Sequence, residues 1–171
     1  FGELRKSMDD LNQAIGLDPQ LGLAFYNRVA AITGGSNYST HTKVLQAEAY
    51  RALGQPKGVV ESLTDEVVEA YSNRGEAYYM RGASYLALGQ FSQAIRDLSA
   101  AIRAEPGRVL AYMARGQTYT RLGNFELAVA DFNQVVRLEP GFGSGFNDRG
   151  VAQRELGELG KSLEDLHESI R

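Results

Sequence analysis

The chain reads EAYYMRGASYLALGQFSQAIRDLSAAIRAEP at residues 76–106 and, directly after a short gap, LAYMARGQTYTRLGNFELAVADFNQVVRLEP at residues 110–140. A third copy in the same frame, SGFNDRGVAQRELGELGKSLEDLHESIR, occupies residues 144–171. Self-similarity at a fixed period of about 34 residues is typical of proteins built from stacked helical repeats. The repeat therefore decides the fold class.

Each copy has the pattern of two amphipathic helices. Apolar and small residues recur at i, i+3, i+4 and i+7, which is the spacing of one helix face. In the first helix of the first copy this face comprises Tyr78, Arg81, Gly82 and Tyr85. The second helix carries Phe91, Ala94, Ile95, Leu98, Ala101 and Ile102, and Pro106 follows it.

Glycine recurs at two places in every copy. The first set follows the first helix, where a positive φ would end it: Gly89, Gly123 and Gly157. The second set lies inside that helix, where glycine costs about 1 kcal/mol relative to alanine: Gly82, Gly116 and Gly150. We expect this second set to allow close helix contact against the small residues Ala94 and Ala128.

These residues resemble the tetratricopeptide repeat, a helix-turn-helix unit of the same period. The resemblance implies an all-α fold, a right-handed superhelical solenoid of antiparallel helix pairs. The third copy departs from the pattern at Gln153, Ser162 and Ser169, where the second carries Tyr119, Ala128 and Val135. We expect this copy to pack less tightly.

We expect one domain over residues 1–171. Residues 75–108, 109–142 and 143–171 form the regular repeats, and residues 1–20 match the second helix of an incomplete repeat, with a helix at Leu4–Ile15. Residues 22–74 are divergent and out of frame. They include an expected first helix at Leu23–Ile32, a loop at residues 34–40 and a helix that ends near Gly54 and Pro56.

Residues 59–88 carry the Arg-Gly pair twice, at Arg74-Gly75 and Arg81-Gly82. Either this segment is one long helix, or it breaks near Ser72–Gly75. We favour the break, because a globular helix of more than about 25 residues without caps is uncommon.

An arginine in each first helix precedes an aspartate in the second helix, at the same interval in all three copies. The pairs are Arg81 with Asp97, Arg115 with Asp131, and Arg149 with Asp165. We expect a partly buried ion pair in each repeat, although two separately solvated charges are the alternative.

Composition excludes several classes of function. The net charge of −3 gives no field to hold a nucleic acid. The absence of cysteine removes disulfides and thiolate metal sites, and His41 and His167 have no ligand set around them. The sequence Gly157–Ser162 lacks the first glycine of a phosphate-binding loop. We therefore expect no enzyme activity, no cofactor, no metal and no membrane span.

The N-terminus has no signal-peptide layout, which favours a cytoplasmic location. The first residue is Phe1 rather than methionine, so we expect an upstream segment.

The surface left on the first helices is the candidate binding site, because stacked repeats use the concave face that these helices line. It changes from apolar and aromatic to polar and basic along the chain. The predicted groove residues are Tyr26, Asn27, Ala30, Tyr79, Ala83, Leu86, Met113, Gln117, Thr120, Arg121, Asn147, Val151 and Arg154.

Such a groove favours a peptide or partner helix with apolar anchors and an acidic end. The resemblance disfavours binding of a chaperone's C-terminal tail, because Tyr79, Ala83, Met113 and Asn147 occupy places where some family members carry the required side chains. Three alternatives remain open: the stripe packs on another domain, the terminal helices mediate self-association, or the chain assists an enzyme located elsewhere.

Overall fold

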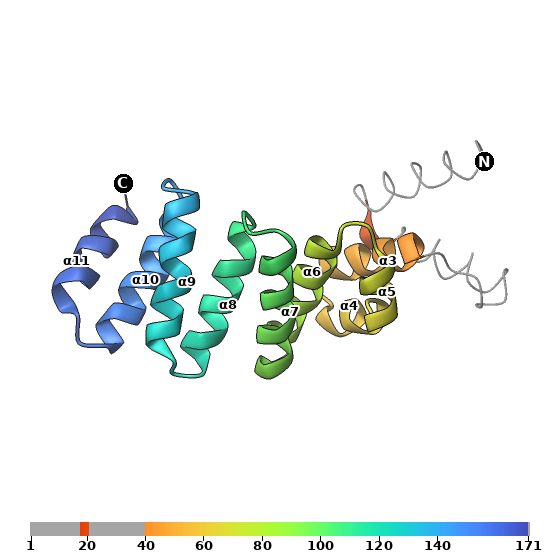
Figure 1. Cartoon of the computed structure of the whole chain (residues 1–171), viewed down its shortest axis with the longest axis horizontal. Helices are drawn as coiled ribbons and strands as arrows, with labels where there is room; N and C mark the ends of the chain where they lie inside the picture. Colours follow the sequence, from red (N-terminus) through yellow and green to blue (C-terminus); the bar gives the residue numbers. More distant parts are fainter. Residues whose placement is uncertain (1–17, 21–39, 171) are drawn as a thin grey trace, which may run out of the picture.

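The computed structural model describes residues 18–20 and 40–170, and within these residues it contains nine helices and no strand. The helices are stacked in succession along the long axis, with α3–α5 near one end and α11 at the other (Figure 1). This is the expected right-handed solenoid of antiparallel helix pairs. The helices are α3 (Thr40–Ala52), α4 (Pro56–Ser62), α5 (Asp65–Ala70), α6 (Arg74–Ala87), α7 (Phe91–Ala104), α8 (Val109–Arg121), α9 (Phe125–Leu138), α10 (Gly143–Glu155) and α11 (Leu159–Glu168).

Glycines end the first helix of each pair, as predicted. Their φ angles are +72° at Gly89, +75° at Gly123 and +79° at Gly157, and Gly54 after α3 has +65°. These angles are the left-handed conformation that glycine adopts without a Cβ clash. The chain therefore reverses direction within a few residues and the next helix packs antiparallel.

The glycines inside the first helices do allow close contact, and the nearest atoms to two of them belong to large side chains of the second helix. A Cβ on Gly82 would lie 2.8 Å from Leu98 Cγ, and one on Gly116 would lie 2.6 Å from Phe132 Cε1. The glycine thus accommodates a large side chain of the second helix. Ala94 and Ala128, the expected partners, are fully buried one turn earlier.

The core runs along the stack between the helix layers. At the α3 end it is assembled from four helices and contains Val44, Ala47, Val59, Leu63, Val67, Val68, Ala77 and Met80. Further along, α8, α9 and α10 bury Met113, Ala128, Phe132, Val135 and Ala152. Each pair thus buries its apolar stripe against the next, which is how an array of short repeats becomes stable.

The segment between α3 and α6 breaks twice. The predicted break near Ser72–Gly75 is confirmed, because α5 ends at Ala70 and α6 begins at Arg74 after Asn73, whose side chain accepts a hydrogen bond from Glu76 N. A second interruption at Leu63–Thr64 separates α4 from α5 and was not predicted. The expected helices Leu4–Ile15 and Leu23–Ile32 lie outside the described residues.

Candidate functional site

The first helices α6, α8 and α10 form a continuous surface because they occupy equivalent places in successive pairs (Figure 1). Residues four apart on each helix lie on the same face. Consequently Ala83 and Ala87 of α6 share a face, as do Gln117 and Arg121 of α8. We call this surface the groove face.

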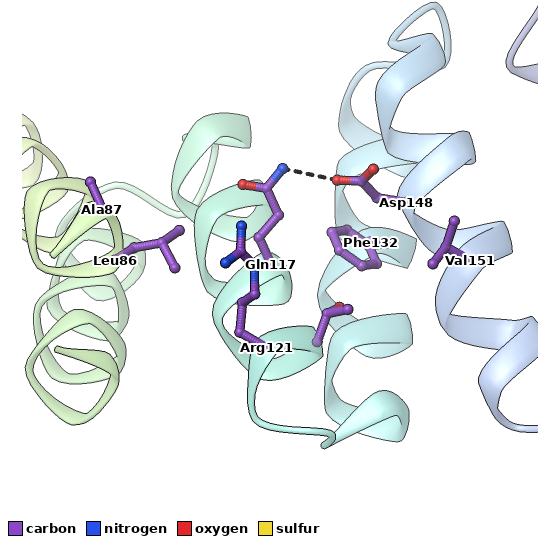
Figure 2. Close-up of a pocket in the computed structure, with 8 residues that line it drawn as sticks. Leu86, Ala87, Gln117, Arg121, Phe132, Asp148 and Val151 are labelled. Atoms are coloured by element: carbon purple, nitrogen blue, oxygen red, sulfur yellow. Dashed lines mark hydrogen bonds between the residues drawn. The ribbon is translucent and has the colours of Figure 1, made fainter. Parts of the chain in front are cut away.

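A hollow of about 390 Å³ lies in the groove face between these three helices (Figure 2). Five predicted groove residues line it, together with Ala87, Phe132 and Asp148, which sequence reasoning missed. We call it the polar hollow. The five are Leu86, Gln117, Thr120, Arg121 and Val151.

A second hollow of about 300 Å³ lies towards α3 and α4, and Ala87 lines both. Two predicted groove residues, Tyr79 and Ala83, contribute to it. We call it the apolar hollow, because Pro56, Val59 and Met80 form much of the remaining wall. The wall of the apolar hollow also includes the exposed Arg51, and that of the polar hollow includes Leu86 and Phe132, so each hollow combines apolar surface with a positive charge.

Of the two charged residues in the polar hollow, Asp148 has hydrogen-bond partners and Arg121 has none among the described residues. Asp148 accepts hydrogen bonds from Gln117 Nε2 at 2.9 Å and from Asn147 Nδ2 at 3.1 Å. Arg121 is exposed, and within the described part of the chain no ion pair or side-chain hydrogen bond engages its guanidinium. A carboxylate entering the hollow would therefore meet one positive charge without a partner.

Tyr79 connects the apolar hollow to the repeat behind it. Its ring lies 5.6 Å from the guanidinium carbon of Arg108, a cation–π distance. Arg108 also pairs with Glu76 and Glu105. Burial raises the pKa of the Tyr79 phenol above its ordinary value. The phenol therefore stays neutral at physiological pH.

Several predicted groove residues do not line either hollow. Met113 is buried with Phe132 in the core, and Asn147 donates to Asp148 from beside the polar hollow. Arg154 instead pairs with the adjacent Glu155 at 2.9 Å, where both side chains are exposed. Tyr26, Asn27 and Ala30 lie outside the described residues.

The predicted ion pairs are confirmed in all three regular repeats, and they hold the first helices in register. Arg81 donates from Nε to Asp97 Oδ2 at 2.6 Å and from Nη2 to Oδ1 at 3.1 Å. Arg115 and Arg149 form the same two-bond pairs with Asp131 and Asp165. Such bidentate pairs fix orientation as well as charge.

Each of these arginines also contacts a residue of the preceding unit. That residue lies as many positions before the arginine as the paired aspartate lies after it. Arg115 Nη1 donates to Ser99 Oγ at 2.9 Å, and Arg149 Nη1 donates to Asn133 Oδ1 at 2.8 Å. The backward partner of Arg81 is Asp65, whose Oδ1 lies 2.8 Å from Nη1. We call these backward contacts the inter-repeat links.

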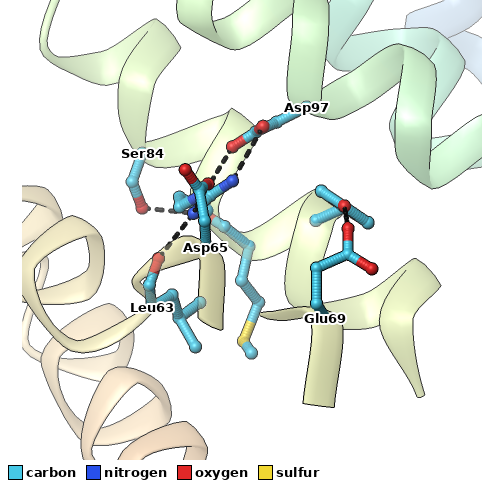
Figure 3. A network of polar contacts seen from close by, with 8 residues as sticks. Leu63, Asp65, Glu69, Ser84 and Asp97 are labelled. Atoms are coloured by element: carbon cyan, nitrogen blue, oxygen red, sulfur yellow. Dashed lines mark hydrogen bonds and ion pairs between the residues drawn. The ribbon is translucent and has the colours of Figure 1, made fainter. Parts of the chain in front are cut away.

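Arg81 is the most heavily coordinated of the three arginines. Only 5% of its surface is exposed, and Leu63 O, Asp65 and Asp97 converge on its guanidinium (Figure 3). Burial by itself would lower its pKa, but hydrogen bonding and charge attraction from Asp97 and then Asp65 outweigh it, so the pKa is raised. Arg81 therefore stays charged in the core.

The sequence contains a weak signal for the inter-repeat links. The residue contacted in the preceding unit lies as far before each arginine as the paired aspartate lies after it. The position after the arginine is aspartate in all three repeats, whereas the position before it varies. The backward positions hold Asp65, Ser99 and Asn133, which share polarity alone. Spacing by itself therefore did not reveal these contacts.

Metal sites and membrane spans are absent from the described residues. No group of three or more His, Asp or Glu side chains there could hold a metal ion. Within the same residues, none of the helices has the length and hydropathy needed to cross a membrane.

Comparisons with known proteins identify the repeat. Residues 79–142 match the family model of the tetratricopeptide repeat. No curated protein matches the sequence.

Solved structures share the fold. A crystal structure of MamA protein superposes with a TM-score of 0.84 at 21% identity, covering 99% of this chain and 92% of that one. A MamA fragment from Desulfovibrio magneticus RS-1 also gives 0.84, at 18% identity, covering 97% and 92%. YrrB, described as a tetratricopeptide-repeat protein with an unusual peptide-binding site, gives 0.74 at 21% identity, covering 98% and 80%.

Proposed function

Because the chain carries tetratricopeptide repeats, we propose that it is a non-catalytic scaffold that binds an extended peptide or a partner helix along its groove face. The observation that supports this proposal is the pair of hollows that meet at Ala87. Extended segments are recognised by pockets for alternate side chains, and helices by apolar grooves. YrrB, which shares the fold, is itself described as having a peptide-binding site.

The chemistry of the two hollows supports a more specific proposal about the partner. An apolar side chain fits against Val59, Tyr79 and Ala83 in the apolar hollow. An acidic side chain then fits near Arg121, whose charge has no partner among the described residues. We propose that the partner carries apolar anchors followed by an acidic end, as the sequence predicted.

The test uses a library of fluorescein-labelled ten-residue peptides that carry two leucines and two aspartates at variable spacing. Anisotropy titrations should find binders whose affinity falls at least about tenfold with Arg121→Glu and weakens with added salt. The matched control is Arg96→Glu, an exposed charge reversal on α7 outside both hollows. Equal affinity for the wild type and Arg121→Glu would reject the placement of the acidic end.

A second candidate function, self-association, is favoured by exposed apolar side chains on α11 and directly after it. Leu159 is 62% exposed, Leu163 70% and Ile170 81%. The equivalent residues of the preceding repeat, Phe125, Val129 and Val136, are partly buried. A second copy of this chain could cover these side chains by end-to-end stacking.

Sedimentation velocity distinguishes this candidate. If α11 mediates self-association, Leu163→Glu should convert concentration-dependent oligomers to monomers. Leu110→Glu, on the exposed start of α8, is the control. A wild-type chain that stays monomeric at high concentration would eliminate self-association and leave the groove proposal intact.

A further inference from the structure

A third cavity of about 290 Å³ lies between α9, α10 and α11 and shares no lining residue with the two hollows of the groove face. Its walls include Val129, Asn133, Arg149, Gln153 and Lys161. We call it the lateral cavity. Nothing in the proposed function uses it.

Gln153 gives this cavity an unsatisfied acceptor. Gln153 is 6% exposed, and its Oε1 is buried with no hydrogen-bond partner in the described part of the chain. A buried polar atom without a partner costs free energy, so native structures rarely leave one. A group in the cavity that donates a hydrogen bond to this buried oxygen would satisfy it.

The second repeat has an aromatic side chain at the position where the third repeat has Gln153. Gln153 occupies the position that Tyr119 holds one repeat earlier. The guanidinium carbon of Arg115 lies 6.0 Å from both the Tyr112 and the Tyr119 rings. Arg115 thus has an aromatic ring one turn before it and another one turn after it.

Arg149, the equivalent arginine, has an aromatic ring on one side only. Phe146 lies 5.4 Å from its guanidinium carbon, while the position one turn later is Gln153. The in-plane donors of Arg149 are already engaged by Asp165 and Asn133. What remains available is a face of the guanidinium, and aromatic rings stack on such faces.

The charges around the lateral cavity favour a ligand without negative charge. Arg149 and Lys161 are opposed by three carboxylates, Glu158, Glu164 and Asp165, and the two cations are already paired with Asp165 and Glu158. An anionic ligand would be repelled by the three carboxylates and would find both positive charges already paired. A neutral ligand that donates a hydrogen bond is not repelled in this way.

We propose that the lateral cavity binds the phenol of a tyrosine side chain from a partner protein. The ring lies against the Arg149 guanidinium, as Tyr119 does against Arg115, and the hydroxyl donates to Gln153 Oε1. This inference does not depend on the groove face, because the two sites share no lining residue.

The probes are N-acetyltyrosinamide, N-acetylphenylalaninamide and N-acetylphosphotyrosinamide, titrated into the full chain labelled with ¹⁵N. The tyrosine probe should shift the amides around Asn133, Arg149 and Gln153. The phenylalanine probe should bind about tenfold more weakly, because it lacks the hydroxyl donor. The phosphotyrosine probe should bind more weakly still.

Two variants locate the site. Gln153→Tyr restores the repeat pattern and fills the cavity, so tyrosine-probe binding should disappear. Gln153→Leu retains the cavity but removes the acceptor, so the tyrosine and phenylalanine probes should bind equally. Arg121→Glu on the groove face should leave tyrosine-probe binding unchanged, and circular dichroism checks that each variant is folded.

Three results would overturn the proposal. The absence of shifts around Gln153 at saturating probe would show that the cavity holds only water. Equal binding of the tyrosine and phenylalanine probes to the wild type would remove the role of the acceptor. Undiminished binding to a folded Gln153→Tyr variant would place the site elsewhere.

Discussion

The unit α3–α5 and the regular pair α8–α9 differ in the polar contact that joins their first helix to their second. In α8–α9 a charged pair, Arg115 and Asp131, joins the two helices. In α3–α5 the equivalent places, at the same interval in the sequence, hold Gln46 and Ser62. The single hydrogen of the Ser62 hydroxyl has two acceptors in reach, Gly58 O at 2.8 Å within the same helix and Gln46 Oε1 at 3.2 Å. A neutral polar contact therefore stands where the other repeats have an ion pair.

The irregular unit also differs from the regular repeats in length, by one residue in the region of its second helix. The interval from Gly54 to Gly89 exceeds one repeat period by a single residue, and so does the interval from Ser62 to Asp97. Asp65 and Ser99, in contrast, are one period apart. The extra residue thus falls between Ser62 and Asp65, where α4 stops and α5 begins. One inserted residue interrupts the helix, and the repeat pattern resumes directly after it.

The interruption leaves the Leu63 carbonyl free to accept a hydrogen bond from Arg81 Nη1 at 2.8 Å. In the regular pairs the equivalent region is continuous helix. The irregular unit therefore depends on its neighbour, because the following repeat supplies the charge that its own Gln46 and Ser62 lack.

Loss of the ion pair between Arg81 and Asp97, beside the irregular unit, should have the largest effect on stability. Asp97→Ala leaves the Arg81 guanidinium buried with only the exposed Asp65 and the Leu63 carbonyl as partners. Breaking a buried pair costs about 3–5 kcal/mol. Urea denaturation should show this loss, and Ser62→Ala, which removes a neutral hydrogen bond, should cost only about 1 kcal/mol. Similar losses for the two variants would mean that the ion pair and the neutral pair are equivalent.

A second test concerns the close helix contact. Gly116→Ala would place a Cβ 2.6 Å from Phe132 Cε1, so the core must shift, at a cost of about 1–3 kcal/mol. Ala47, which matches Gly82 once the inserted residue is counted, already carries a Cβ in the equivalent position of the irregular unit. Ala47→Gly should therefore cost about 1 kcal/mol, mainly from helix propensity. The difference can be measured by thermal melting, and a Gly116→Ala variant as stable as the wild type would show that Phe132 has room to move.

The ion pair of the regular repeats can be transferred into the irregular unit α3–α5, with a small expected gain. Ser62→Asp alone places a carboxylate at a buried position and should destabilise the chain. Gln46→Arg together with Ser62→Asp should recover stability, with a coupling energy of about 1 kcal/mol between the two substitutions. Denaturation of the two single variants and the double variant measures it. Additive effects would show that α3 and α4 are not spaced to hold the pair.

The regular repeats could be predicted because their features are local or strictly periodic. The helix ends at Gly89 and Gly123, and the pairing of Arg81 with Asp97, follow from spacing alone. The contact of Gly82 with Leu98 was not predicted, because the repeat frame does not specify how closely two helices approach or which side chain fills the space.

The candidate site could be predicted only in outline. Helix periodicity placed Leu86, Gln117 and Arg121 on one face, and these residues line the polar hollow. Phe132 was missed because it belongs to a second helix and reaches the hollow through the space left by Gly116. The break between α4 and α5 was missed because no glycine or proline marks it. The signals that do mark it are Thr64 before the acidic Asp65 and Glu66, which is typical of a helix start, and the count of residues across two repeats.

The inter-repeat links have a consequence for how this array comes apart. In a linear array, stability is the sum of a folding term for each unit and an interface term for each adjacent pair. Among the inter-repeat links, the one before α6 uses a carboxylate, Asp65, whereas those before α8 and α10 use the neutral Ser99 and Asn133. The interface before α8 also holds the ion pair of Arg108 with Glu76, whose side chains are only 15% and 25% exposed, whereas Asp65 is 86% exposed. Added salt should therefore weaken the Arg81–Asp65 link more than the shielded Arg108–Glu76 pair. Amide exchange at rising ionic strength would then show α3–α5 opening as a unit of its own while the remaining repeats stay protected.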